Sequence, residues 1–150
     1  MCNQTCKKWF HLITSVLGVI FGLSSFIAFF CVYGNLNAGL WGFISGVFAS
    51  LCLHLHYLHI KQKLDSYHSV QTLHSLKILA TVGALAGLAG TFWYLFFSIY
   101  HHVPILPVQS STFIAAVWAF LTCKWGILLF VYCRHYIIIL QGDYPPLTGI

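Results

Sequence analysis

The chain has 150 residues, of which 59% are hydrophobic and only 6% are charged, and its formal net charge is +5. A soluble domain carries about 25% charged residues, so this composition could not cover a water-facing surface. It excludes a soluble globular protein and indicates an integral membrane protein in contact with the lipid bilayer. Seven basic residues in a chain of this length form no patch of the kind that binds nucleic acid.

Four apolar segments predict four transmembrane helices, at about residues 10–33, 38–60, 75–99 and 113–140. Each segment exceeds the roughly 20 residues that cross a hydrocarbon core as an α-helix. None alternates polar and apolar residues as the strands of a membrane β-barrel do. The expected fold is an all-α membrane protein, with residues 1–150 forming a single four-transmembrane-helix bundle.

The first segment follows Lys7 and Lys8 as the apolar part of a signal peptide would. It is too long for one and lacks a small-residue cleavage site, so we expect it to remain as a helix. The letters GNLN after it predict a tight turn and an antiparallel helix hairpin. Glycine pairs spaced four residues apart in three helices allow backbones to approach closely. They predict packing within a compact bundle, with a homo-oligomer as an alternative use.

The second segment ends in the letters CLHLHYLHIK, which place His54, His56 and His59 in its last turns. His56 and His59 are three residues apart and therefore share a helix face, whereas His54 points elsewhere. Imidazole titrates near neutral pH and binds iron, zinc or copper. We expect at least one of these histidines to contact a substrate, and the pattern leaves open which one faces it.

The connections between segments predict the topology. Basic residues gather at the N-terminus and around the second connection, KQKLDSYHSVQTLH, which we expect to be a short polar loop. The first and third connections contain no lysine or arginine. The positive-inside rule therefore predicts that both termini and the second loop are cytosolic. His101 and His102, which begin the third connection, would then lie on the extracellular or lumenal side.

Lys124 lies in the middle of the fourth segment, where a lysine costs roughly 2.5–3.5 kcal/mol on insertion scales. The two acids of the chain, Asp65 and Asp143, lie outside the apolar segments. Two interpretations remain open: a neutral amine bonded to hydroxyls or carbonyls, or a cation that lines a cavity and meets an anionic ligand group. By helical geometry His135 lies about 20° from Lys124 and Tyr132 about 80° away. These residues thus form one stripe on the helix, which runs from Lys124 to a histidine–tyrosine cluster at the cytosolic end. The tyrosines would also suit the aromatic belt at the membrane interface.

Haem fits these residues better than a bare metal ion does. A bare transition metal prefers histidine, cysteine and carboxylate ligands and would be repelled by Lys124. Haem iron takes an axial histidine or tyrosine, and its macrocycle stacks on aromatic rings. Its propionates are anions that Lys124 or Arg134 can meet. Other amphipathic anions would also suit the lysine.

The fourth-helix letters VWAFLTCKWGILLFVY and the overlapping letters YCRHY resemble the haem-responsive-gene family of four-pass haem transporters. The resemblance covers the whole bundle and is strongest in the second and fourth helices. YCRHY stands where the family has a Phe-Ala-Arg-Lys-Tyr motif implicated in haem binding. Arg134 and Tyr136 match that motif, whereas Tyr132, Cys133 and His135 replace Phe, Ala and Lys. The change at His135 removes a cation that could meet a propionate and adds an iron ligand.

The resemblance also implies roles for three histidines. The family's second-helix ligand, a histidine in some members and a tyrosine in others, falls on His56 when the preceding letters GVFASLCLH are matched. Its exoplasmic histidine falls on His101 or His102. The acidic tail of the vertebrate members is missing. The letters YPPL at residues 144–147 instead resemble a tyrosine-based sorting signal. Plasma membrane and endosome or lysosome both remain open as locations.

We therefore expect a non-enzymatic permease that imports haem from the extracellular or endosomal/lysosomal lumen into the cytosol. His101 or His102 would accept haem, Lys124 would hold a propionate, and His56 would bind the iron near the exit. The expected haem-contacting residues at the exit are His56, His59, Tyr132, Arg134, His135 and Tyr136. The rivals are a structural or trafficking tetraspan protein, a haem-binding membrane redox protein, and a zinc or copper carrier. An acidic donor compartment is a further expectation, because five histidines are placed along the path and no acid lies in the apolar segments, so that any proton coupling would run through histidine.

Overall fold

The computed structural model describes residues 2–61 and 63–143, and these residues form helices and no strand. Four helices are long and apolar enough to cross a membrane, which confirms the predicted all-α fold with four membrane spans. The spans are Trp9–Val32, Leu36–Ile60, Val70–Tyr100 and Thr112–Gly142. Residues 144–147, which carry the predicted sorting signal, lie outside the described residues.

The first span is not α-helical along its whole length. Helix α1 (Cys2–Ser25) continues as a π-helical segment (Phe26–Val32), and a short turn then leads into α2. The remaining helices, in chain order, are α2 (Leu36–Ile60), α3 (Leu64–Tyr67), α4 (Val70–Tyr100) and α5 (Thr112–Asp143).

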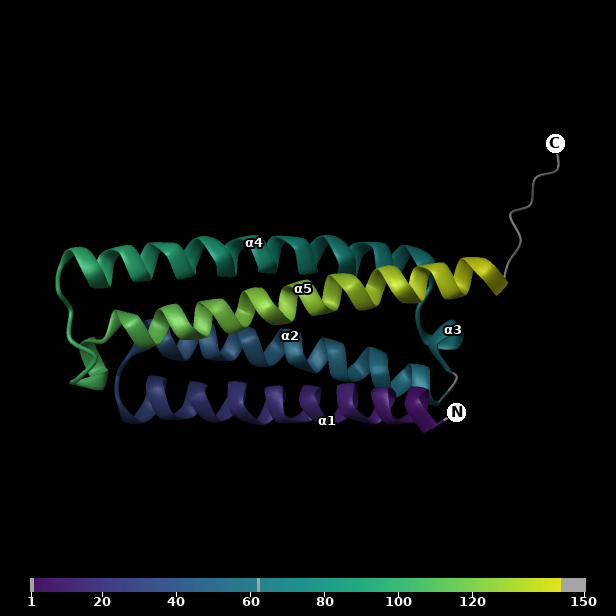
Figure 1. Cartoon of the computed structure of the whole chain (residues 1–150), viewed down its shortest axis with the longest axis horizontal. Helices are drawn as coiled ribbons and strands as arrows, with labels where there is room; N and C mark the ends of the chain where they lie inside the picture. Colours follow the sequence, from purple (N-terminus) through teal and green to yellow (C-terminus); the bar gives the residue numbers. More distant parts are fainter. Residues whose placement is uncertain (1, 62, 144–150) are drawn as a thin grey trace.

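The long helices pack in the order α1, α2, α5, α4 (Figure 1). Helix α2 packs closely against α1 and α5, and α5 also packs against α4, so that α1 and α4 form the flanks. Helix α1 begins and α5 ends at the same end of the bundle, which we call the terminal end; the opposite end is the loop end. Large apolar side chains such as Phe21 on α1 and Phe92 on α4 are exposed, as expected for faces that contact lipid.

Glycines bring neighbouring helix backbones together within the chain. A Cβ atom added to Gly22 of α1 would lie only 2.7 Å from the backbone nitrogen of Gly46 in α2. A Cβ atom on Gly87 of α4 would lie 2.7 Å from the carbonyl oxygen of Ala119 in α5. Small residues at such crossings allow van der Waals contact between backbones, which the lipid environment does not otherwise drive. These glycines therefore serve packing inside the bundle.

The predicted second loop is partly helical. It contains α3, and α4 begins at Val70, several residues earlier than expected. The side chain of Ser69 caps α4 by accepting a hydrogen bond from the backbone N–H of Thr72 at 3.2 Å. A serine cap satisfies a backbone donor at a helix start, so the polar letters after it still begin a helix.

At the loop end, Asn35 joins two connections. Its buried side chain accepts a hydrogen bond from the N–H of Ala38 at 3.1 Å, which caps α2. Its amide nitrogen donates to the carbonyl oxygens of Val108 and Ser111 at 2.8 and 2.9 Å. One side chain thus holds the α1–α2 turn against the segment that precedes α5.

Candidate functional site

A histidine- and tyrosine-rich pocket of about 270 Å³ lies at the terminal end of the bundle. It is formed by α1, α2 and α5, and we call it the His–Tyr pocket. Its lining residues are His11, His56, His59, Ile60, Val131, Tyr132, His135 and Tyr136.

His56 is the buried imidazole of this pocket, with 7% of its surface exposed. It follows Ala49 and Cys52 at helical spacing and so lies on the buried face of α2. Its Nδ1 lies 3.0 Å from the hydroxyl of Tyr136. Its Nε2 is buried and has no hydrogen-bond partner among the residues that the structure describes. When the tyrosine oxygen accepts from Nδ1–H, the Nε2 lone pair is left open toward a ligand.

His11 of α1 is a pocket residue that the sequence did not lead us to expect. Its Nδ1 lies 3.0 Å from the hydroxyl of Tyr132, and its ring is stacked on that of His56 with centroids 5.7 Å apart and planes 14° from parallel. The hairpin could have indicated this pairing. Gly34 in the turn is almost equidistant along the chain from His11 and His56, so an antiparallel hairpin brings both to the same depth.

The other predicted exit residues divide between the pocket and the outside. The ring of His59 packs 4.9 Å from that of Tyr136, measured between centroids. His135 also lines the pocket, although its side chain is exposed. Arg134 is exposed as well, but it is not among the lining residues. The pocket thus combines imidazoles and phenols, and Arg134 lies outside it.

The side chain of Lys124 is exposed, and it lines a second hollow of about 240 Å³ where α1 and α5 meet Ser45 of α2, with Thr14 and Gly18 among the lining residues from α1. We call this the Lys124 hollow. The amine of Lys124 lies 5.1 Å from the centre of the Trp125 ring, a cation–π distance. That ring is itself buried and packs directly against Gly18, where no larger residue would fit.

The two hollows follow one seam. Helix α1 has close backbone contacts with α2 rather than with α5, so side chains alone fill the space between α1 and α5. His11 in the His–Tyr pocket and Thr14 in the Lys124 hollow are one helical turn apart on α1. Along α5, Lys124 and Tyr132 are separated by about 12 Å at 1.5 Å per residue. Lys124 is exposed at mid-span on α5, and the α1–α5 seam leads from its hollow to the imidazoles of the His–Tyr pocket.

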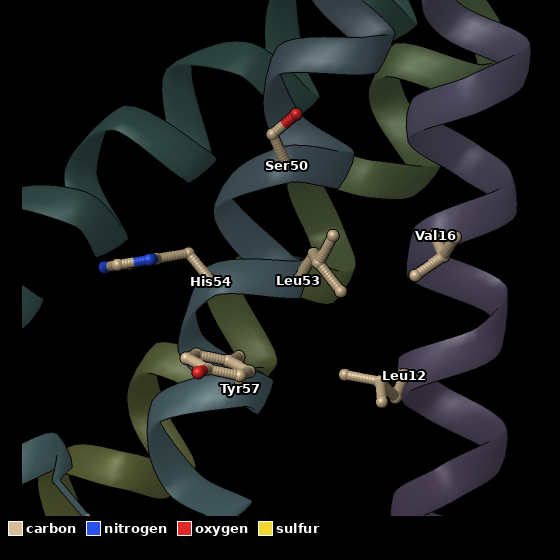
Figure 2. A pocket seen from close by; sticks show the side chains of 6 residues that line it. All are labelled: Leu12, Val16, Ser50, Leu53, His54 and Tyr57. Carbon is tan, nitrogen blue, oxygen red and sulfur yellow. The ribbon is translucent and has the colours of Figure 1, made fainter. Parts of the chain in front are cut away.

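His54 lies on a different side of α2. It borders a mostly apolar hollow of about 420 Å³ between α1 and α2, where its ring points away from Leu12 and Val16 (Figure 2). Its ring packs edge-on against that of His68, with centroids 5.4 Å apart. Burial, and then the neighbouring His54 imidazole, lower the pKa of His68 below its ordinary value.

His101 and His102 lie at the loop end, where α4 ends. Both are exposed, and the ring of His101 packs 4.4 Å from that of Phe97, measured between centroids. His102 adopts a positive φ of 50°, which turns the chain out of the helix. These histidines are at the opposite end of the bundle from the His–Tyr pocket and share no hollow with it.

The pocket does not have the ligand set of a site for a bare metal ion. Among the described residues, no group of three or more histidine, cysteine or acidic side chains could hold a metal. A metal that arrives with most of its ligands, by contrast, needs only one open imidazole nitrogen from the protein.

Comparison with known proteins identifies the family. A sequence model of a protein family, described as endosomal/lysosomal haem transporters of the haem-responsive-gene family, matches residues 73–125. The chain is 31% identical over 156 residues to the heme transporter hrg-1 of Caenorhabditis elegans, an alignment that covers 98% of this chain and 79% of that protein. No solved structure matches. The family-model match includes Lys124, His101 and His102 but ends before the α5 residues of the His–Tyr pocket. The near-complete alignment and the four membrane spans show that the chain belongs to the haem-responsive-gene family of haem transporters.

Proposed function

We propose that this protein transports haem from the extracellular or lumenal side of its membrane to the cytosol. The observation that carries the proposal is Nε2 of His56, which is buried in the His–Tyr pocket and has no hydrogen-bond partner in the described part of the chain. An open nitrogen in a buried site costs free energy unless a ligand satisfies it. Haem iron, which brings its own equatorial nitrogens, takes such a nitrogen as an axial ligand.

Lys124 supplies the charge that the cargo needs. Neither acid of the chain lies within a membrane span, so an anion for this amine has to come with a ligand. A haem propionate is such an anion. The buried Trp125 ring, 5.1 Å from the amine, gives the charge a cation–π partner beside the hollow. In this proposal Lys124 holds a propionate during passage, and Arg134, exposed near the exit, meets it as haem leaves.

The direction follows from the distribution of charge and of histidine. Lysines gather at the terminal end, so we place both termini in the cytosol. His101 and His102 then receive haem on the donor side, and the His–Tyr pocket delivers it on the cytosolic side. The endosome or lysosome is the proposed location, with the plasma membrane as an alternative. Because histidine titrates in this range, we expect uptake to change between about pH 5 and pH 8.

Passage requires the seam to widen. Pockets for drug-sized ligands are roughly 300–1,000 Å³, and the His–Tyr pocket, at about 270 Å³, is below that range. Helix α1 flanks the bundle and packs closely against α2 rather than α5. Separation of α1 from α5, with α1 still packed on α2, therefore breaks few backbone contacts across the seam.

The test is growth of a haem-auxotrophic cell at low external haem. Wild type should restore growth, whereas His56→Ala and Lys124→Ala should restore it poorly at equal amounts of protein in the membrane. His74→Ala and Lys63→Ala are the matched controls, because both side chains are exposed and outside the two hollows. Equal rescue by all five proteins would reject these site assignments. No rescue by correctly located wild type would reject haem import.

The rivals predict different results. A haem-binding redox protein would retain stoichiometric haem through purification and show sharp reduced-minus-oxidised absorbance bands. A carrier should instead release haem to a soluble acceptor protein. A structural or trafficking tetraspan protein would neither bind haem nor lose function when Lys124 is replaced by Leu. A zinc or copper carrier would bind those ions in competition with a fluorescent haem analogue.

A further inference from the structure

The strongest feature that the proposed function does not use is His11. It lies on α1, outside the helices that carry the expected exit residues, and yet its ring is stacked on that of His56. We propose that His11 is a second ligand of the haem iron, so that His11 and His56 hold the iron together. This inference rests on the proposed function and deepens it at the same site.

The two imidazoles are held in the same way. Nδ1 of His11 lies 3.0 Å from the hydroxyl of Tyr132, and Nδ1 of His56 lies 3.0 Å from the hydroxyl of Tyr136. A hydrogen bond from Nδ1–H to an oxygen fixes the tautomer and orients the ring, as it does for metal-bound histidines in general. When both phenol oxygens accept from Nδ1–H in this way, Nε2 of each residue is the atom left to bind a metal. One such pair would also suit a merely structural histidine; two adjacent pairs indicate a paired ligand site.

The separation of the rings supports binding of one iron by both. A bond of about 2 Å from a first-row metal to an imidazole nitrogen places the centroids of two opposed imidazoles about 6 Å apart. The centroids of His11 and His56 are 5.7 Å apart in a stacked arrangement, so the spacing matches, and binding of one iron needs both Nε2 edges turned toward the metal. The helices that carry them therefore already have a suitable spacing. Rings of Tyr132 and Tyr136 lie beside the pair and offer contacts to a macrocycle.

A two-imidazole site also connects haem release with the proposed widening of the α1–α5 seam. His11 comes from α1, the flanking helix, whereas His56 comes from α2, which packs against both α1 and α5. Iron bound by both residues links α1 to the rest of the pocket. Release of the bond to His11 frees α1 to move outward and leaves haem on His56 alone.

The experiment is a titration of the purified full-length protein in detergent with ferric haem, followed by absorbance and electron paramagnetic resonance spectroscopy. Wild type should give a low-spin, six-coordinate spectrum. His11→Asn should keep a hydrogen bond to Tyr132, since the amide replaces the Nδ1 edge of the ring, but should remove Nε2. We expect it to give a high-spin, five-coordinate spectrum and about tenfold weaker binding. Added free imidazole should restore the low-spin spectrum.

Two further variants distinguish loss of an iron ligand from a defect in folding. His11→Met offers a thioether ligand and should give the spectrum of mixed histidine–methionine ligation in the reduced protein. His74→Asn, at an exposed site on α4, should behave as wild type. The inference is overturned if wild type is five-coordinate, or if His11→Asn keeps the wild-type spectrum and affinity.

The outcomes separate this inference from the proposed function. If His56→Asn loses haem while His11→Asn does not, the second ligand is wrong and the transport proposal stands. If wild type itself binds no haem, both are wrong.

Discussion

The hydroxyl of Tyr136 lies 3.0 Å from Nδ1 of His56, on the edge of the ring opposite the nitrogen that has no partner among the described residues. Both side chains are buried, and they join α2 to α5 at the terminal end of the bundle. When the phenol oxygen accepts from Nδ1–H of His56, the opposite nitrogen is left open to a ligand.

We expect Tyr136→Phe to weaken haem binding while the fold is kept. Without the hydroxyl, the imidazole loses the contact that orients its ring, and Nδ1 loses its hydrogen-bond partner. A loss of about 1 kcal/mol corresponds to roughly fivefold weaker binding. Titration with haem, monitored at its main absorbance band, measures the change. Tyr57→Phe is the control, since that side chain is exposed on α2; equal effects of both variants would refute the argument.

Lys124 should recognise the carboxylates of haem rather than its ring. Lys124→Met removes the charge and keeps much of the side-chain length, so haem binding should weaken by about three- to tenfold, or roughly 1 kcal/mol. Lys124→Arg should bind nearly as wild type.

The dimethyl ester of haem makes this prediction specific to the propionates. The ester has no carboxylate, so wild type and Lys124→Met should bind it equally well in the same detergent. If the substitution weakens binding of ester and haem alike, Lys124 acts through packing on Trp125 and not through charge.

The fold followed from sequence because apolar length alone specifies a membrane helix, and the spans therefore appear close to the expected segments. The boundaries differ where local chemistry decides them: Ser69 caps α4 earlier than hydropathy indicates, and the π-helical segment at Phe26–Val32 has no pattern of its own. Hydropathy averages over a window and cannot register one capping side chain.

The site was harder to predict than the fold. Helical spacing separated His54 from His56 and His59 correctly, because those residues lie on one regular helix. His11 was missed because its importance depends on contact between helices, which the pattern within one segment does not contain. For Lys124, the structure adds the Trp125 ring as a neighbour that neither interpretation of the sequence had included.

Asn35 should contribute more to stability than its exposed neighbour Asn37. Asn35→Ala removes the cap of α2 and leaves the carbonyl oxygens of Val108 and Ser111 without this donor. Loss of a cap costs about 0.5–2 kcal/mol, and each unsatisfied buried acceptor about 1–3 kcal/mol. Thermal unfolding in detergent should show a clearly lower midpoint for Asn35→Ala. Asn37→Ala should be close to wild type, and equal midpoints for the two variants would contradict this role.

His68 should make the stability of the fold depend on pH at the connection between α2 and α4. Burial and the nearby His54 imidazole lower its pKa below the ordinary value of 6.5, and neither ring nitrogen has a hydrogen-bond partner among the described residues. As the pH falls, His68 is therefore protonated at a higher pH in the unfolded chain than in the folded chain. By linkage, the contribution of His68 to stability is present above pH 6.5 and is lost as the pH falls from 6.5 toward the lowered pKa.

The measurement compares unfolding midpoints of wild type and His68→Gln across this pH range. Wild type should lose stability on acidification more steeply than His68→Gln, which cannot titrate. His74→Gln, at an exposed histidine on α4, should retain the wild-type slope. If His68→Gln has the same slope as wild type, the acid sensitivity arises elsewhere in the chain. If its slope is steeper, His68 gains stability on protonation and the sign of the predicted effect is wrong.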